Sequence, residues 1–98
     1  MVTLRIEHAI HDYDTWQRAF DGFAGARAKA GVRRYAVRQP ADDPTFLTLD
    51  LEFDTAGQAE AFASFLHRHV WSSPESSPAL AGRPQTRVLD VRRAEAHA

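Results

Sequence analysis

Residues 45–53 read Thr45-Phe46-Leu47-Thr48-Leu49-Asp50-Leu51-Glu52-Phe53. From residue 47 onward, leucine or phenylalanine occupies every second position, and threonine, aspartate and glutamate stand between them. Because successive side chains of a β-strand point to opposite faces of a sheet, this alternation predicts a strand with one apolar and one polar face. The apolar face of such a strand has to be covered by other elements of the fold.

The segment before this strand predicts that it belongs to a hairpin. Residues 32–39 alternate in the same way, and four of the five positions 40–44 are proline or aspartate, which favour turns. With the turn centred near Asp42, Arg34 is expected opposite Asp50, which would pair opposite charges across the two strands.

Both ends of the chain show the same period of two. In residues 2–9, one face carries Val2, Leu4, Ile6 and His8 and the other carries Thr3, Arg5 and Glu7, which predicts a first strand. Residues 86–93 predict a last strand, with Leu89 and Val91 expected on its apolar face.

Two stretches change to helical spacing. Aromatic residues recur every three to four positions after Asp12, a suitable N-cap, and Gly31 is a suitable C-terminal stop. The stripe of this first helix consists of Tyr13, Trp16, Phe20, Phe23 and Arg27. Residues 56–70 form the second predicted helix, with Thr55 and Gln58 as a capping box. Residues 72–78 contain two prolines and four serines and predict a loop.

This order of elements predicts one α+β domain over residues 1–98 with ferredoxin-like βαββαβ topology. Right-handed crossovers place both helices on one face of a four-stranded antiparallel sheet. The helix-facing side chains are expected to be Val2, Leu4, Ile6, Tyr35, Val37, Leu47, Leu49, Leu51, Leu89 and Val91, packed on Trp16, Phe20, Phe23, Phe62 and Leu66. The opposite face is expected to carry Thr3, Arg5, Glu7, Arg34, Arg38, Thr48, Asp50, Glu52, Val88, Asp90 and Arg92.

The polar face of the sheet has two interpretations. One face of an antiparallel sheet is often exposed to water. Alternatively, this nearly charge-balanced face meets a two-fold copy of itself, so that basic residues lie near acidic ones across the interface. The alternation alone does not choose between the two.

Composition argues against several classes of protein. The formal net charge is −1, so no strong field would attract nucleic acid or an anionic membrane. There is no cysteine for a disulfide or thiolate site, and no apolar run resembles a signal or a membrane span. A cytoplasmic location is therefore expected. His67 and His69 are two residues apart, so on a helix they point in different directions and are not expected to share a metal ion.

Several segments resemble the dimeric α+β barrel superfamily, in particular its small stand-alone members that are antibiotic biosynthesis monooxygenase-like or cyclase-like. They are Asp12-Tyr13-Asp14-Thr15-Trp16 with Phe20, Gly31-Val32-Arg33-Arg34-Tyr35, Leu49-Asp50-Leu51-Glu52-Phe53, Trp71-Ser72-Ser73-Pro74, and Pro78-Ala79-Leu80-Ala81-Gly82 with Pro84. The resemblance implies a homodimer whose sheets close a barrel, and a ligand held between the helices and the sheet of each subunit. It does not identify a substrate.

Within that implied cleft, His8 and His67 are the candidate catalytic bases, since an imidazole titrates near neutral pH. Trp16, Tyr35 and Trp71 are the candidate substrate-binding residues. Each has a simpler interpretation: His8 as a histidine at the sheet rim bonded to a carbonyl, Trp16 and Tyr35 as core residues. Trp71 precedes the serine-rich loop, which favours a lid over the cleft.

The function hypothesis is a small-molecule enzyme that deprotonates an aromatic or polyketide-like phenol, after which the anion reacts with dioxygen or closes a ring. No cofactor and no metal are expected. The alternative is a non-catalytic ligand-binding or accessory homodimer, and a third is a purely structural role. The haem-degrading branch of the superfamily relies on an asparagine, and this sequence contains none.

Overall fold

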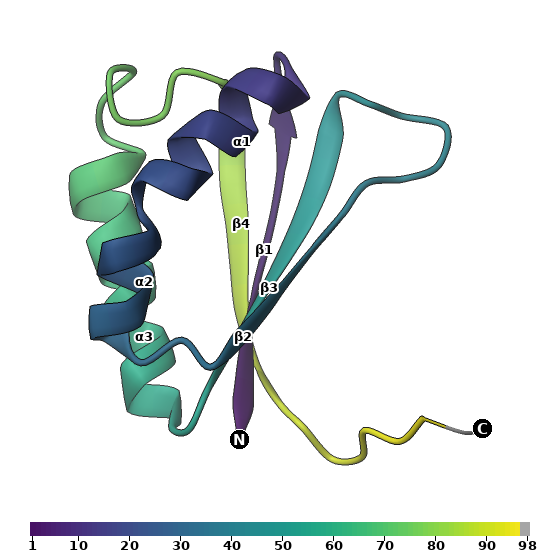
Figure 1. Cartoon of the computed structure of the whole chain (residues 1–98), viewed down its shortest axis with the longest axis vertical. Helices are drawn as coiled ribbons and strands as arrows, with labels where there is room; N and C mark the ends of the chain where they lie inside the picture. Colours follow the sequence, from purple (N-terminus) through teal and green to yellow (C-terminus); the bar gives the residue numbers. More distant parts are fainter. Residues whose placement is uncertain (97–98) are drawn as a thin grey trace.

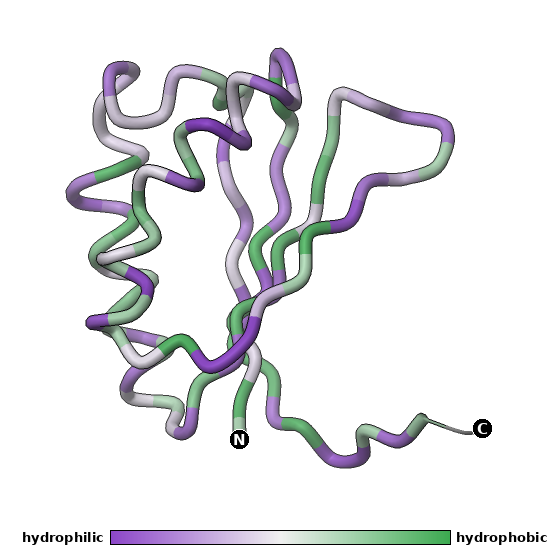
Figure 2. Tube along the Cα trace, viewed as in Figure 1, coloured by the Kyte–Doolittle hydropathy of each residue, from purple (hydrophilic) through white to green (hydrophobic). Residues whose placement is uncertain are grey.

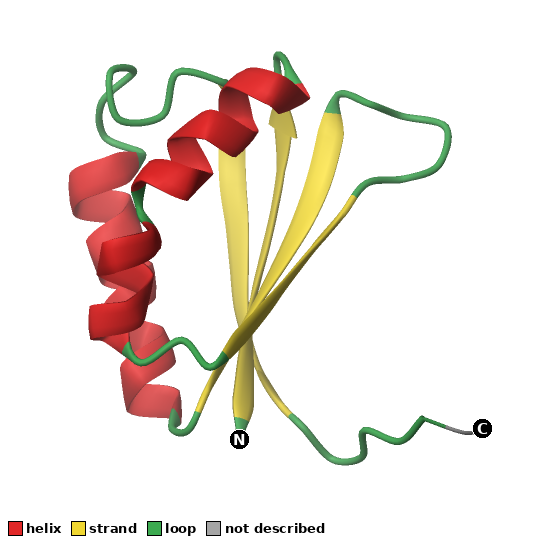
Figure 3. Ribbon diagram, in the orientation of Figure 1, coloured by secondary structure: helices red, strands yellow, loops and turns green. Residues whose placement is uncertain are grey.

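The computed structural model describes residues 1–96 as an antiparallel sheet with helices packed on one of its faces (Figures 1 and 3). The elements, in chain order, are β1 (Val2–Ile10), α1 (Tyr13–Gly22), α2 (Ala24–Ala30), β2 (Arg34–Arg38), β3 (Phe46–Phe53), α3 (Ala56–Phe65), the π-helical turn η1 (Leu66–Val70) and β4 (Leu80–Asp90). The four strands have the order β2-β3-β1-β4. This arrangement confirms the predicted ferredoxin-like α+β fold. No helix within residues 1–96 is long and apolar enough to cross a membrane.

The central pairing joins β1 to β3. Leu4 lies opposite Leu51, and His8 lies opposite Leu47, so the apolar sides of the two strands coincide. Figure 2 shows apolar and polar positions alternating along these strands. The helices cover the leucine side, where Leu4, Leu47 and Leu51 are fully buried. The predicted apolar faces of β1 and β3 are thereby confirmed.

The register of the hairpin differs from the prediction by two residues. Arg34 lies opposite Glu52 rather than opposite Asp50, because the turn centres one residue later than expected. Asp50 instead accepts hydrogen bonds from Arg5 on β1 and Arg38 on β2. Because the register is shifted by an even number of residues, each side chain stays on its predicted face of the sheet.

The last strand begins earlier than predicted, and the faces of its apolar residues were predicted wrongly. β4 starts at Leu80, and its pairing with β1 puts Val88 opposite Leu4 and Leu89 opposite Thr3. Val88 therefore packs against the core, and Leu89 belongs to the open face. Two adjacent aliphatic residues leave the face ambiguous in the sequence, so the pairing partner decides it.

The same register corrects two further residues of this segment. Asp90 lies opposite Val2, which is on the helix side of the sheet, and was predicted on the open face. Val91 lies beyond the end of β4 and is 39% exposed, so it is not part of the core.

The first predicted helix is divided into α1 and α2 at Phe23. The Asp12 carboxylate accepts a hydrogen bond from the Thr15 amide and caps α1, as predicted. At Phe23 the backbone leaves helical geometry, with φ −99° and ψ 14°. Glycines on either side, at positions 22 and 25, have low helix propensity and favour the break. α2 ends at Ala30 and is capped by Gly31, whose φ of 92° suits glycine.

The second predicted helix ends in a π-helical turn. Thr55 and Gln58 form the predicted capping box at the start of α3. After Phe65 the chain continues as η1, and the Trp71 amide donates to the Leu66 carbonyl. Such wider turns are rare in proteins as a whole, and those that do occur are often found at functional sites. Here η1 leads directly into Trp71 and the serine-rich loop.

Candidate functional site

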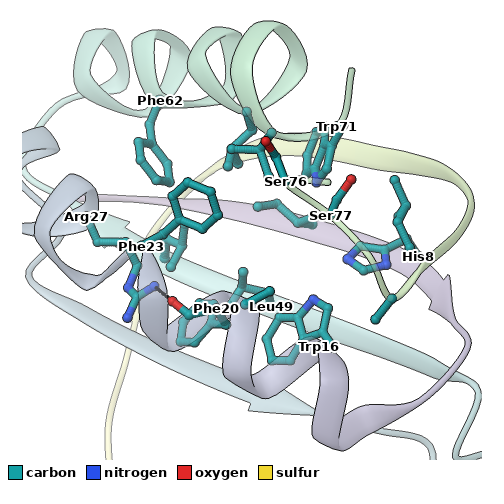
Figure 4. A pocket seen from close by; sticks show the side chains of 17 residues that line it. His8, Trp16, Phe20, Phe23, Arg27, Leu49, Phe62, Trp71, Ser76 and Ser77 are labelled. Carbon is teal, nitrogen blue, oxygen red and sulfur yellow. Dashed lines mark hydrogen bonds between the residues drawn. The ribbon is translucent and has the colours of Figure 1, made fainter. Parts of the chain in front are cut away.

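A cavity of about 70 Å³ lies between the helices and the sheet (Figure 4). α1 and α2 form one side, α3 and η1 a second, and β1 and β3 the floor, while Ser76 and Ser77 of the loop after η1 line its remaining side. Most of the lining is aromatic or aliphatic. This is the place in which the superfamily resemblance implies a ligand.

His8 is the buried titratable group of this cavity. It occupies a helix-facing position near the end of β1 and is only 5% exposed. Its Nδ1 lies 2.9 Å from the Ala9 carbonyl oxygen. Because a carbonyl oxygen can only accept, Nδ1 carries the proton, and in the neutral ring Nε2 is the acceptor. Nε2 has no hydrogen-bond partner among residues 1–96 and is available to the cavity.

The backbone of the neighbouring strand is irregular beside His8. Opposite His8, the register of β4 jumps, so that residues 82–84 face this single residue of β1. Gly82 adopts a φ of 79° within the bulge, a conformation that favours glycine. The regular ladder is thus interrupted beside the imidazole, and bulges are frequent next to functional sites.

Burial lowers the pKa of His8 below its ordinary value of 6.5. The low-dielectric surroundings disfavour the charged imidazolium, and the hydrogen bond to Ala9 opposes this effect only in part. His8 is therefore neutral at neutral pH, as a proton acceptor must be.

Two tryptophans line the cavity near His8. Trp16 of α1 is almost fully buried and stacks on Phe20, with ring centroids 4.9 Å apart. Trp71 lies at the start of the loop after η1, and both tryptophans are seen toward the His8 end of the cavity in Figure 4. Flat aromatic walls are suited to a flat aromatic guest.

The loop over the cavity is held by local hydrogen bonds. The Ser76 and Ser77 amides both donate to the Ser73 carbonyl, and the Ser77 hydroxyl donates to the same oxygen. The His11 amide donates to the Ala79 carbonyl at the end of the loop. The loop is thus anchored at Ala79 to the residue that follows β1, and the hydrogen bonds of its middle residues stay within the loop.

Two predicted site residues lie outside the cavity. Tyr35 is 51% exposed on the edge strand β2 and packs edge-on against Phe20. His67 is exposed on η1 and packs edge-on against Trp71, 4.8 Å between ring centroids. Neither side chain lines the cavity, and Tyr35 is not the core residue that the alternation suggested.

Arg27 is a cavity residue to which the sequence interpretation gave no role. It is only 8% exposed, and its guanidinium carbon lies 3.6 Å from the centre of the Phe20 ring. Figure 4 shows it at the opposite end of the cavity from His8. The signal was present in the sequence, because Arg27 keeps the helical spacing of the aromatic stripe.

The open face of the sheet carries a second hollow, of about 340 Å³, lined by charged side chains and by Leu89 and Val91. Asp50 is its central anion and forms salt bridges with Arg5 and Arg38 at 2.9 and 3.2 Å. The hydrogen bond from Arg5 holds the pKa of Asp50 below its ordinary value. Within residues 1–96, no group of three or more histidine, aspartate or glutamate side chains is placed to hold a metal ion.

The buried His8 predicts a specific pH dependence of stability. Since its pKa is lower in the folded chain than in the unfolded chain, the unfolded chain binds the proton first as the pH falls. The free energy of unfolding should therefore be greatest above the ordinary value of 6.5 and decrease as the pH falls through it. The decrease in the free energy of unfolding stops below the folded-state pKa of His8. Its total is about 1.4 kcal/mol for each pH unit by which folding lowers that pKa.

Urea unfolding at fixed chain concentration, between about pH 8 and about pH 5, measures this decrease. His8→Gln should abolish it, and the exposed His67→Gln should retain it. The aspartates whose pKa is lowered, such as Asp50, contribute only at more acidic pH, near and below 3.8. A wild-type stability that does not change over this range would contradict a buried neutral His8.

Several solved structures share the fold of this chain. A Deinococcus radiodurans protein described as antibiotic biosynthesis monooxygenase-like superposes with a TM-score of 0.73 at 12% identity, over 100% of this chain and 99% of that one. SnoaB from Streptomyces nogalater, a cofactor-independent oxygenase, superposes with a TM-score of 0.71 at 16% identity, over 98% and 97%. A dimeric ferredoxin-like protein from an uncultured marine organism gives a TM-score of 0.63 at 12% identity, over 95% and 96%.

No protein-family model matches the sequence, and no curated protein matches it. At these low identities, the likeness to solved structures establishes the fold. The chain therefore has the ferredoxin-like fold found in antibiotic biosynthesis monooxygenase-like and dimeric ferredoxin-like proteins.

Proposed function

We propose that this chain is a homodimeric, cofactor-independent monooxygenase-like or cyclase-like enzyme acting on an aromatic or polyketide-like compound. His8 is the general base, and Trp16 and Trp71 hold the substrate in the cavity. The observation that carries the proposal is the neutral His8 whose Nε2 is free inside an aromatic cavity. The similarity in fold to SnoaB, itself a cofactor-independent oxygenase, supports it.

The chemistry begins with proton transfer. Nε2 of His8 takes a proton from an acidic C–H or O–H group of the substrate, and the aromatic rings of the substrate delocalise the resulting anion. In an oxygenation, this anion gives electrons to dioxygen, and a C–O bond forms. His8 returns the proton to the peroxide, and loss of water leaves a carbonyl group. In a cyclisation, the carbanion attacks a carbonyl carbon of the same molecule, and His8 protonates the alkoxide.

The size of the cavity requires movement before a substrate binds. Pockets for small organic ligands usually have volumes of roughly 300–1,000 Å³, and this cavity has about 70 Å³. The segment from Trp71 to Ser77 is the element that can enlarge it, because its middle is held by hydrogen bonds to its own residues. We propose that this segment acts as a lid.

The same small volume supports a second candidate function. A cavity largely filled by Trp16, Phe20 and Phe23 fits a non-catalytic ligand-binding or accessory homodimer. Such a protein would not convert an aromatic compound, whether the cavity stays filled by its own side chains or opens to bind one. Turnover, measured beside binding, separates the two candidates.

The homodimer is proposed to form through the open face of the sheet. That face places Arg5, Asp50 and Arg38 in one network, with Leu89 beside them in the same hollow. Charges of both signs around an aliphatic residue are suited to a self-complementary two-fold interface. Residues 91–96 leave the sheet on the side away from the helices, where a second subunit would lie (Figure 1).

Substitutions at the cavity test the enzymatic proposal. With anthrone as a probe, one O₂ per molecule is taken up to give anthraquinone and one water, and oxygen uptake can be followed directly. His8→Ala should lower the catalysed rate by roughly 100-fold or more, because general base catalysis contributes that much. Trp71→Ala should weaken binding of the probe, seen by calorimetry.

His69→Ala is the matched control, since it removes an exposed imidazole of η1 that packs on Phe65 and does not line the cavity. It should retain the rate. Binding of anthrone without oxygen uptake would favour the accessory function, whereas equal rates for wild type and His8→Ala would exclude His8 as the base.

The dimer is tested by adding a charge to the open face. Sedimentation equilibrium of the wild type should give about twice the chain mass of 11.0 kDa. Leu89→Glu buries an unpaired carboxylate in the proposed interface and should shift the mass to that of a monomer. Ala61→Glu adds the same charge on the exposed surface of α3 and should leave the dimer intact. Wild-type monomers at high concentration would contradict the interface.

A further inference from the structure

Arg27 is a buried cation that forms no salt bridge with a carboxylate among residues 1–96. It contrasts with Arg5, Arg33 and Arg38, each of which pairs with an aspartate at the surface. Burying a cation without a counter-ion is unfavourable, so a buried arginine normally has an anionic partner. Arg27 lines the cavity, where such a partner could bind.

The contacts of Arg27 leave most of its donors free. One guanidinium nitrogen donates to the Phe20 carbonyl at the end of α1, and the guanidinium lies over the Phe20 ring. A guanidinium has five N–H donors. No buried nitrogen or oxygen of a described side chain lacks a hydrogen-bond partner, so the remaining donors of Arg27 face accessible space. They are available to a ligand.

The two polar ends of the cavity differ in charge. The Arg27 end is cationic, the His8 end is neutral, and Phe20, Phe23 and Leu49 provide an apolar stretch between them (Figure 4). A planar guanidinium binds a carboxylate through parallel hydrogen bonds. An elongated guest with an anion at one end and an aromatic body matches this arrangement.

We propose that Arg27 binds the carboxylate of an aromatic acid and thereby sets the substrate class of the cavity. The aromatic body of this acid lies along Phe20 and Phe23, with its reactive end toward His8. The inference rests on the proposed function, because it requires the cavity to admit a ligand. It adds that the ligand is an acid and that Arg27 gives the specificity.

Matched acid and amide probes test the inference. Benzoate and 2-naphthoate are compared with benzamide and 2-naphthamide, which have nearly the same shape but no charge, by calorimetry at neutral pH. A hydrogen-bonded charge pair should make each acid bind roughly tenfold or more tightly than its amide. Arg27→Met should abolish the preference for the acid, because it removes the charge pair, and should weaken amide binding much less than acid binding. Arg27→Lys should retain part of the preference.

The control variant is Arg68→Met, which removes an exposed arginine of η1 outside the cavity. It should keep the full preference for the acids. If Arg27→Met does not fold because the Phe20 carbonyl keeps only backbone donors such as the Phe23 amide, the wild-type comparison of acids with amides, together with Arg27→Lys, still tests the inference.

The outcomes separate this inference from the proposed function. Equal wild-type affinities for acid and amide, or a preference for acids that persists in folded Arg27→Met, would overturn the role of Arg27 while the cavity remains a ligand site. Binding of none of the four probes would overturn the role of Arg27, and the anthrone experiment then decides separately whether the cavity admits an aromatic ligand.

Discussion

The strand β1 is paired with β3 and β4 along its two edges, and the core under the helices covers the face that its even-numbered side chains occupy. Four of these positions are occupied by Val2, Leu4, Ile6 and Ile10, which are buried in the core. The remaining position is His8. An imidazole in this row is desolvated by the same packing that holds the sheet to the helices. Its state of protonation is therefore a consequence of the fold.

This constraint is also the basis of the chemistry that we propose for the site. Desolvation keeps the ring neutral, and the Ala9 carbonyl selects the tautomer in which Nε2 accepts. The bulge in β4 interrupts the ladder beside the ring. Arg27, at the other end of the cavity, is the only buried charged side chain among residues 1–96. Its guanidinium lies over the Phe20 ring, so this end of the cavity is cationic and the His8 end is neutral. A neutral base, His8, and a cation, Arg27, at opposite ends of the cavity match the aromatic acid that we propose as its ligand.

The sequence predicted those parts of the fold that local patterns determine. The alternation in residues 2–9 and 45–53, the Asp12 cap and the capping box at Thr55 were all confirmed. Features set by pairing between distant segments were not predictable in this way. The face of Val88 depends on its partner Leu4, and the hairpin register depends on the conformation of a long turn.

The site was predictable in outline for a related reason. His8 and Trp16 lie on recognisable apolar stripes, so the sequence placed them at the boundary between helices and sheet, and Trp71 followed from its position after a helix. The same alternation put Tyr35 on the helix side, but the edge position of β2 leaves it 51% exposed. Arg27 was in phase with the aromatic stripe, yet a long cationic side chain on a stripe can extend to solvent. Only the packing in the structure shows that the Arg27 side chain stays buried.

The most direct test of this account is the protonation state of one ring. Long-range ¹H–¹⁵N correlation spectra of uniformly ¹⁵N-labelled protein at neutral pH distinguish the two tautomers and the imidazolium, and His8→Gln assigns the signal. The account predicts a neutral His8 with the proton on Nδ1 and an unprotonated Nε2. A His8 ring that is charged, or that carries its proton on Nε2, would contradict it.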